Sequence, residues 1–121
     1  MAAITDITWQ QLQDAIGVTG AVTVTGTAPN ETVMIDVSKV NGDTIQELTA
    51  AGVIECLAKL FYAARSAQTA ANEGQANGER LNAFLQPTQA IQGDQTVLVT
   101  QQLQFKVPVN QNLSVVNGPN V

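Results

Sequence analysis

This chain of 121 residues has no histidine and a single cysteine, Cys56. Histidine is the usual general base and the commonest metal ligand in proteins, so its absence excludes histidine-dependent nucleophiles and most zinc sites. A lone cysteine cannot form an internal disulfide. Cys56 lies in an apolar part of an expected helix, which predicts a buried and unreactive thiol. We therefore expect no enzyme activity and no cofactor.

Motifs that bind phosphate or calcium are also missing. No glycine-rich turn leads into the Lys-Ser/Thr pair of a phosphate-binding loop. The acidic residues never alternate as they do in a calcium-binding loop. These absences leave packing and neutral hydrogen bonding as the chemistry of the chain.

Charged residues are scarce, at 12% of the chain against an ordinary share of roughly 25%. Five Lys and Arg oppose ten Asp and Glu, which gives a net charge of −5, and the basic residues are scattered singly. Nucleic acid and anionic membranes both require clustered basic side chains, so neither is an expected partner. Gln, Asn and Thr supply the polarity instead, and a neutral polar surface of this kind suits contact with other proteins.

Long apolar runs are absent as well. The most apolar stretch, residues 50–64, is shorter than the roughly 20 residues that cross a bilayer, and it carries Glu55 and Lys59. The first residues lack the basic and apolar segments of a signal peptide. We expect a protein without a membrane span or signal peptide, located in the cytoplasm or on a particle.

The first half of the chain predicts a short helix followed by a β-hairpin. Thr8 and Gln11 fit a capping box, and Gly17 follows the last helical position, so a helix is expected over residues 8–16. Apolar and polar residues then alternate over 21–25 and 32–37, on either side of a Pro-Asn turn. Two alternating segments joined by a short turn are typical of a hairpin.

The second half predicts a long helix and a second hairpin. Asp43 and Thr44 each begin a capping pair, so the helix is expected to start there and to run to about Ala71. Residues 81–91 and 96–107 are expected to be the next two strands, with Pro87 marking the first as an edge strand. The fold class is therefore α+β, with one mainly antiparallel sheet backed by the long helix. Residues 1–107 are expected to form a single domain, and 108–121 a C-terminal arm or tail.

The long helix is apolar over more than half of its circumference, whereas covering one small sheet needs about a third. Two explanations stay open. The short N-terminal helix or the C-terminal segment covers the excess, or the excess is a subunit interface. The interface candidates on the helix are Ile54, Leu57 and Phe61, and the candidates in the tail are Leu113 and Val115.

Two functions from different classes are compatible with these features. The first is a non-catalytic structural or assembly protein that forms a homo-oligomer and meets other structural proteins. Its Thr-, Val-, Gln- and Asn-rich composition resembles that of subunits of phage-like and other multi-subunit particles. The alternative is a small-ligand binding module with a pocket between helix and sheet, whose polar contacts are expected to be Trp9, Tyr62, Gln101 and Gln102.

Overall fold

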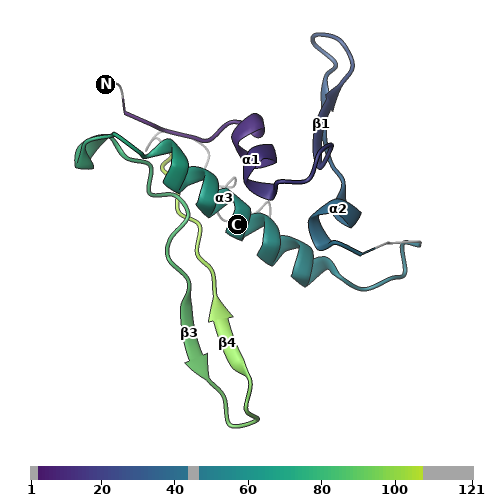
Figure 1. Cartoon of the computed structure of the whole chain (residues 1–121), viewed down its shortest axis with the longest axis vertical. Helices are drawn as coiled ribbons and strands as arrows, with labels where there is room; N and C mark the ends of the chain where they lie inside the picture. Colours follow the sequence, from purple (N-terminus) through teal and green to yellow (C-terminus); the bar gives the residue numbers. More distant parts are fainter. Residues whose placement is uncertain (1–2, 44–46, 108–121) are drawn as a thin grey trace.

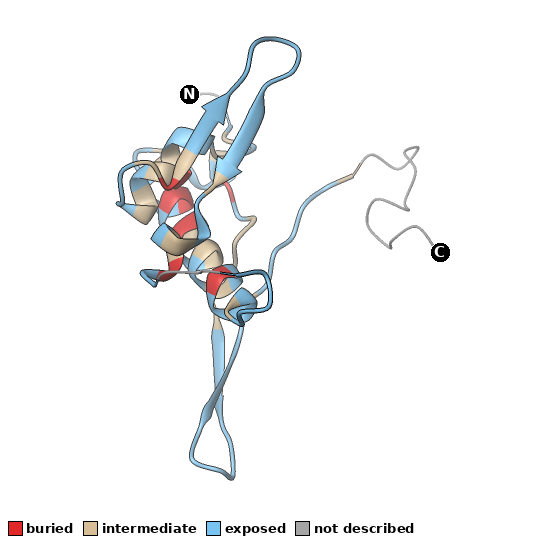
Figure 2. Ribbon diagram, turned by 90° about the vertical axis from the view of Figure 1, so that its right-hand side faces the viewer, coloured by how far each residue is buried: buried red, intermediate tan, exposed pale blue. Residues whose placement is uncertain are grey.

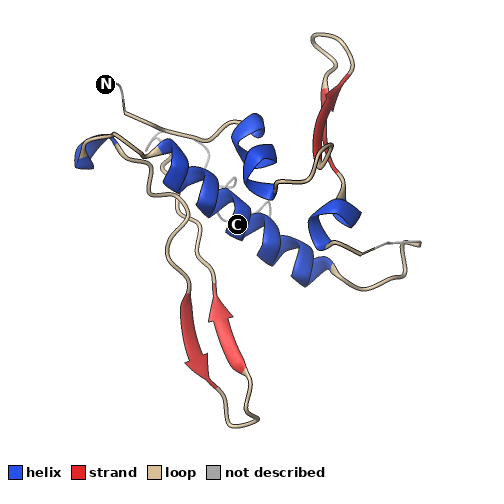
Figure 3. Ribbon diagram, in the orientation of Figure 1, coloured by secondary structure: helices blue, strands red, loops and turns tan. Residues whose placement is uncertain are grey.

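The computed structural model of the chain describes residues 3–43 and 47–107 (Figures 1 and 3). The long helix α3 is the central element, α1 packs across it, and two hairpins project away from it in different directions. The α+β class is confirmed, as is the order of short helix, hairpin, long helix and second hairpin. The elements are α1 (Trp9–Ile16), β1 (Val22–Thr25), β2 (Thr32–Ile35), α2 (Val37–Asn41), α3 (Val53–Ala71), the 3-10 helix η1 (Asn77–Glu79), β3 (Thr88–Ile91) and β4 (Val97–Thr100).

Helix α1 begins and ends where its sequence signals predict. The Gln11 N–H donates to the Thr8 hydroxyl at 3.1 Å, and the Thr8 N–H donates to the Gln11 side chain at 2.8 Å, so the capping box is complete. Gly17 ends the helix in the left-handed conformation, with φ 78°, which glycine adopts without a steric penalty. Local hydrogen bonds thus define α1, and its apolar residue Leu12 is left to pack on α3.

The first hairpin is confirmed, but its second strand is shorter than expected. Strands β1 and β2 pair antiparallel, with Val24 opposite Val33. The predicted extension of the strand through Val37 is wrong, because Asp36 caps the short helix α2. Its carboxylate accepts the Lys39 N–H at 3.3 Å. A side chain that satisfies a free N–H of the first helical turn favours helix over a continued strand.

The predicted start of the long helix at Asp43 and Thr44 is wrong. The preceding glycine, Gly42, ends α2 with φ 79°, and α3 begins eleven residues later, at Val53 after Gly52. The turn at Gly42 therefore ends α2, a short helix that the alternation of apolar and polar residues did not predict. The predicted end of α3 at Ala71 is confirmed. Glu55 and Lys59, four residues apart on this helix, form an ion pair at 2.9 Å.

The second hairpin is confirmed, but its strands are shorter than the expected 81–91 and 96–107, because regular pairing covers only β3 and β4. The expected single sheet is wrong. Strands β3 and β4 pair antiparallel and follow Pro87, and a separate bridge joins Phe84 to Leu103. The two hairpins form two sheets of two strands each, and they lie apart (Figure 3). Alternation predicts that a segment is a strand and which neighbour it meets through a tight turn. Alternation does not predict whether two hairpins pair into one sheet, because that depends on where the helices place each hairpin.

The core is small and lies where α1 crosses α3. Leu12, Ala63 and Ala64 form its buried centre, and no large side chain in the described part of the chain is fully buried. Figure 2 shows most of the buried residues on the helices, while both hairpins are almost wholly exposed. Phe61 on α3 meets Phe84 edge to face, with ring centroids 5.6 Å apart.

Amide side chains attach the peripheral segments to the helices. The Gln68 side chain accepts the N–H groups of Ala83 and Phe84 at 2.8 and 2.9 Å and donates to the Phe84 carbonyl at 2.9 Å. One turn further along α3, Asn72 makes a two-way pair with the backbone of Leu81, at 2.8 Å in each direction. We call Gln68 and Asn72 the amide clamps of α3. They pair with residues 81–84 as a neighbouring strand would.

A third amide does the same at α1. Gln13 donates to the Val18 carbonyl and accepts the Val22 N–H, each at 2.7 Å, so it links α1 to the start of β1. Side-chain amides offer both a donor and an acceptor, which lets one residue satisfy both polar groups of a backbone segment. The abundant Gln and Asn side chains therefore hold parts of the fold together, in addition to making the surface polar.

Candidate interaction surface

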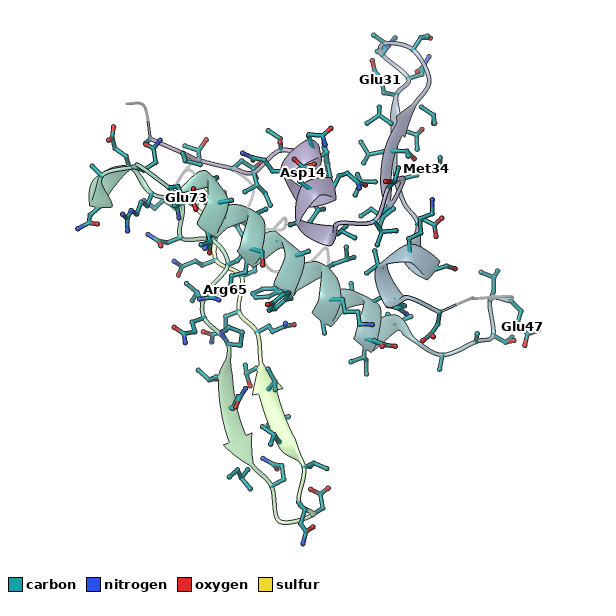
Figure 4. The ribbon with its side chains drawn as sticks, in the orientation of Figure 1. Asp14, Glu31, Met34, Glu47, Arg65 and Glu73 are labelled. Carbon is teal, nitrogen blue, oxygen red and sulfur yellow. The ribbon has the colours of Figure 1, made fainter. Side chains whose placement is uncertain are left out.

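Ionisable groups are not gathered into a site. The carboxylates labelled in Figure 4 lie on separate elements: Asp14 on α1, Glu31 at the tip of the first hairpin, and Glu73 just beyond α3. Among residues 3–43 and 47–107 no three His, Cys, Asp or Glu side chains are placed to hold a metal ion. The carboxylate of Asp94 has its pKa lowered because the Thr96 hydroxyl and then the Thr96 N–H donate to it. This contact closes the β3–β4 turn.

The feature that stands out is an apolar groove along α3. It has a volume of about 420 Å³ and opens to solvent. Helix α1 and strand β2 bound it on one side, and the segments around Phe84 and Leu103 bound it on the other. Its lining residues are Leu12, Ile35, Leu57, Leu60, Phe61, Ala64, Phe84, Gln101 and Leu103. Gln101 is the one polar side chain among them. We call this the α3 groove.

A second open groove, of about 520 Å³, lies on the other side of Gln101. The Gln101 side chain donates to the Ala58 carbonyl of α3 at 3.2 Å, and it borders both grooves. This groove is more polar, since Glu55, Lys59 and Tyr62 line it. Lys59 also donates to the Asn41 carbonyl at 2.8 Å, which holds the end of α2 against α3.

The helical interface candidates occupy different environments. Ile54 is 87% exposed and Leu57 is 60% exposed, and Leu57 lines the α3 groove. Phe61 is half-buried against Phe84, so its ring is part of the fold as well as of the groove. The tail candidates Leu113 and Val115 lie outside the described residues, and their role stays a prediction.

The polar contacts expected for a ligand pocket are only partly brought together. Tyr62 and Gln101 both line the second groove. Trp9 is exposed on α1, and the backbone of Gln102 accepts the Leu85 N–H, but neither residue lines a groove. The exposed strand residues of β3 and β4 were not among the interface candidates, although the uncharged apolar run of Val97, Leu98 and Val99 was the signal that could have identified them.

Comparison with known proteins adds no relative. No protein-family model, curated protein sequence or solved structure matches this chain. None of the helices formed by the described residues combines the length and hydropathy needed to cross a bilayer.

Cys56 is buried on α3, and we expect its thiol to react with a thiol reagent only after denaturation. The matched control is Ser66→Cys, which places a thiol on the exposed side of the same helix. Mass spectrometry should show one label per chain on the native control and none on the native wild type. Rapid labelling of the wild type would contradict the assignment and reopen a redox role.

Proposed function

We propose that this protein is a non-catalytic structural subunit that self-associates, as the subunits of phage-like and other multi-subunit particles do. One observation carries the proposal. Large apolar side chains are exposed on three elements that carry few charges, namely both hairpins and the first turns of α3. The buried core between α1 and α3 consists mainly of small residues, so the chain buries few of its large side chains by itself.

Several of the exposed apolar residues lie on the same element or the same groove. Leu57 and Leu103 both line the α3 groove, and Val97, Leu98 and Val99 are consecutive residues of β4. Monomeric proteins seldom leave contiguous apolar patches of several hundred Å² in water, and such patches usually mark protein contacts. A second chain covering the groove and the hairpins would complete the burial that one chain lacks.

The alternative, a small-ligand module, has weaker support. Small-molecule pockets enclose 70–90% of the ligand surface and place a few convergent polar groups around it. Both grooves here are open, and the α3 groove has Gln101 as its one polar side chain. An open apolar groove fits a protein side chain or segment better than a dissolved metabolite.

The test is the molar mass in solution. Size-exclusion chromatography with light scattering at tens of micromolar should give at least twice the 12.7 kDa of one chain. The apparent mass should fall on dilution if the contacts are reversible. A single species of 12.7 kDa at these concentrations would contradict the proposal.

A further inference from the structure

The segment that contains β4 has a symmetric sequence. Residues 96–100, which are β4 and the threonine before it, read Thr-Val-Leu-Val-Thr in both directions, centred on Leu98. All four residues of β4 are exposed, and its outer edge pairs with no other strand among the described residues. An edge strand presents free N–H and C=O groups that pair readily with another chain. A palindromic edge suits an antiparallel two-fold contact between identical chains, because each residue then lies opposite a residue of the same type.

The directions of the backbone N–H and C=O groups along β4 agree with this symmetry. The Gln92 N–H donates to the Thr96 carbonyl, so residue 96 turns its polar backbone groups toward β3. Along an antiparallel strand, successive residues direct their backbone N–H and C=O groups to alternate sides. Leu98 and Thr100 therefore also direct these groups toward β3, while Val97 and Val99 direct theirs outward. Val97 and Val99 stand at equal distances from the centre at Leu98. Their free groups are thus placed to bond each other across a two-fold axis.

We infer that two copies of this chain pair through the open edges of β4, antiparallel and centred on Leu98, to make a continuous four-stranded sheet. This inference rests on the proposed function and names its contact. Val97 of one copy forms a hydrogen-bonded pair with Val99 of the second copy, and Val99 with Val97. The two Leu98 residues form the non-hydrogen-bonded pair at the centre, where side chains approach most closely.

The side chains on both faces match in this register. On one face Val97 and Val99 of the two copies lie opposite each other, and Val97 also pairs with Ile91 of its own chain, which is 86% exposed in the single chain. On the other face the Leu98 residues meet between Thr96 and Thr100 of opposite copies. Pairs of β-branched residues and pairs of threonines are favourable across antiparallel strands. The shared apolar face is then twice as long as in one chain.

Charge does not oppose a second copy as the occupant of this edge. Each chain carries a net charge of −5, so two copies repel each other wherever their acidic surfaces meet. Between Arg80 and Lys106 the only charged residue is Asp94, which lies in the turn at the tip of the hairpin. The strands therefore form a neutral surface on an acidic molecule. The edge of β4 also lacks the lysine or proline that usually protects an exposed strand.

Proline substitutions test the edge. Val99→Pro removes an outward N–H from β4 without removing a bond to β3, and we expect it to raise the dimer dissociation constant by a factor of roughly ten to one hundred. The matched control is Gln89→Pro, which removes an outward N–H from the opposite edge of the same hairpin. Dissociation constants come from sedimentation, and circular dichroism verifies that both variants fold. Equal dissociation constants for the two variants would overturn the inference.

Cysteine cross-linking tests the register and does not depend on a loss of stability. Under mild oxidation Leu98→Cys should form a disulfide-linked dimer, because the paired Cα atoms lie within disulfide range. The single variants Val97→Cys and Val99→Cys should not form such a dimer. In each of them the two cysteines, one from each copy, would lie diagonally across the strands, with their Cα atoms about 7–8 Å apart or more. A mixture of these two variants should cross-link.

The wild type, with Cys56 only, is the background for this assay. Cross-linking of Val97→Cys alone as fast as Leu98→Cys would overturn the register. If the wild type is oligomeric, but Val99→Pro does not weaken association and Leu98→Cys does not cross-link, the β4 contact is refuted and the proposed function still stands. A monomeric wild type would refute both.

Discussion

Replacing Gln68 by alanine is expected to lower the free energy of unfolding by about 2–4 kcal/mol. The Gln68 side chain is buried and makes three hydrogen bonds to the backbone of Ala83 and Phe84. Alanine leaves those N–H and C=O groups without their partner and loosens the segment that carries Phe84 onto Phe61. A buried polar group left unpaired costs more than an average hydrogen bond contributes. Urea unfolding followed by circular dichroism measures the change.

The control for this variant is Gln10→Ala on α1. Gln10 is exposed and bonds only to the side chain of Asp14, at 2.8 Å, so we expect a change below about 0.5 kcal/mol. Both variants are compared with the wild type at one protein concentration, because association adds to apparent stability. Equal effects of the two substitutions would show that Gln68 does not act as a clamp.

Replacing Leu57 by glutamate is expected to weaken self-association by at least a hundredfold. Leu57 is exposed in the single chain and lines the α3 groove, so the fold tolerates a charge there. In an assembly that covers the groove, the same charge would be desolvated without a partner, at a cost of several kcal/mol. Light scattering over a dilution series measures the shift in mass.

The matched control is Ser66→Glu, which adds the same charge to an exposed position of the same helix away from both grooves. It should keep the mass of the wild type. Ile54→Glu is a second test on the exposed start of α3, whereas Phe61→Glu is unsuitable because it would disrupt the contact with Phe84. If Leu57→Glu and Ile54→Glu both keep the mass of the wild type, the start of α3 and the α3 groove are not part of the contact.

The interface candidates could be predicted only in part. The wide apolar arc of α3 pointed to Ile54, Leu57 and Phe61, and two of the three are exposed. Helical spacing places residues on a face, but it does not tell which part of that face a neighbouring element covers. Helix α1 covers Ala63 and Ala64, and Phe84 covers one side of Phe61. The sequence alone could not divide the arc into its covered and open parts.

Signals between residues a few positions apart determined the local elements from the sequence alone. Thr8, Gln11 and Gly17 bound α1 because caps act through the nearest free backbone groups. The turns on either side of alternating strands placed both hairpins, since a tight turn leaves its strands one partner within reach. Local signals misled between Asp36 and Thr44. Asp36 and Gly42 bound a short helix where alternation predicted a strand through Val37, and the capping pairs at Asp43 and Thr44 do not begin α3.

Only the tertiary structure decided how these elements meet. It separated the two hairpins into two sheets, and it turned Gln68 and Asn72 from polar residues of a helix into clamps on residues 81–84. Among residues 3–43 and 47–107, it also left the outer edge of β4 without a neighbouring strand. The physical reason is distance along the chain. Caps and turns join residues within a few positions, whereas a clamp, a groove and a free edge depend on segments that approach only once the helices have packed.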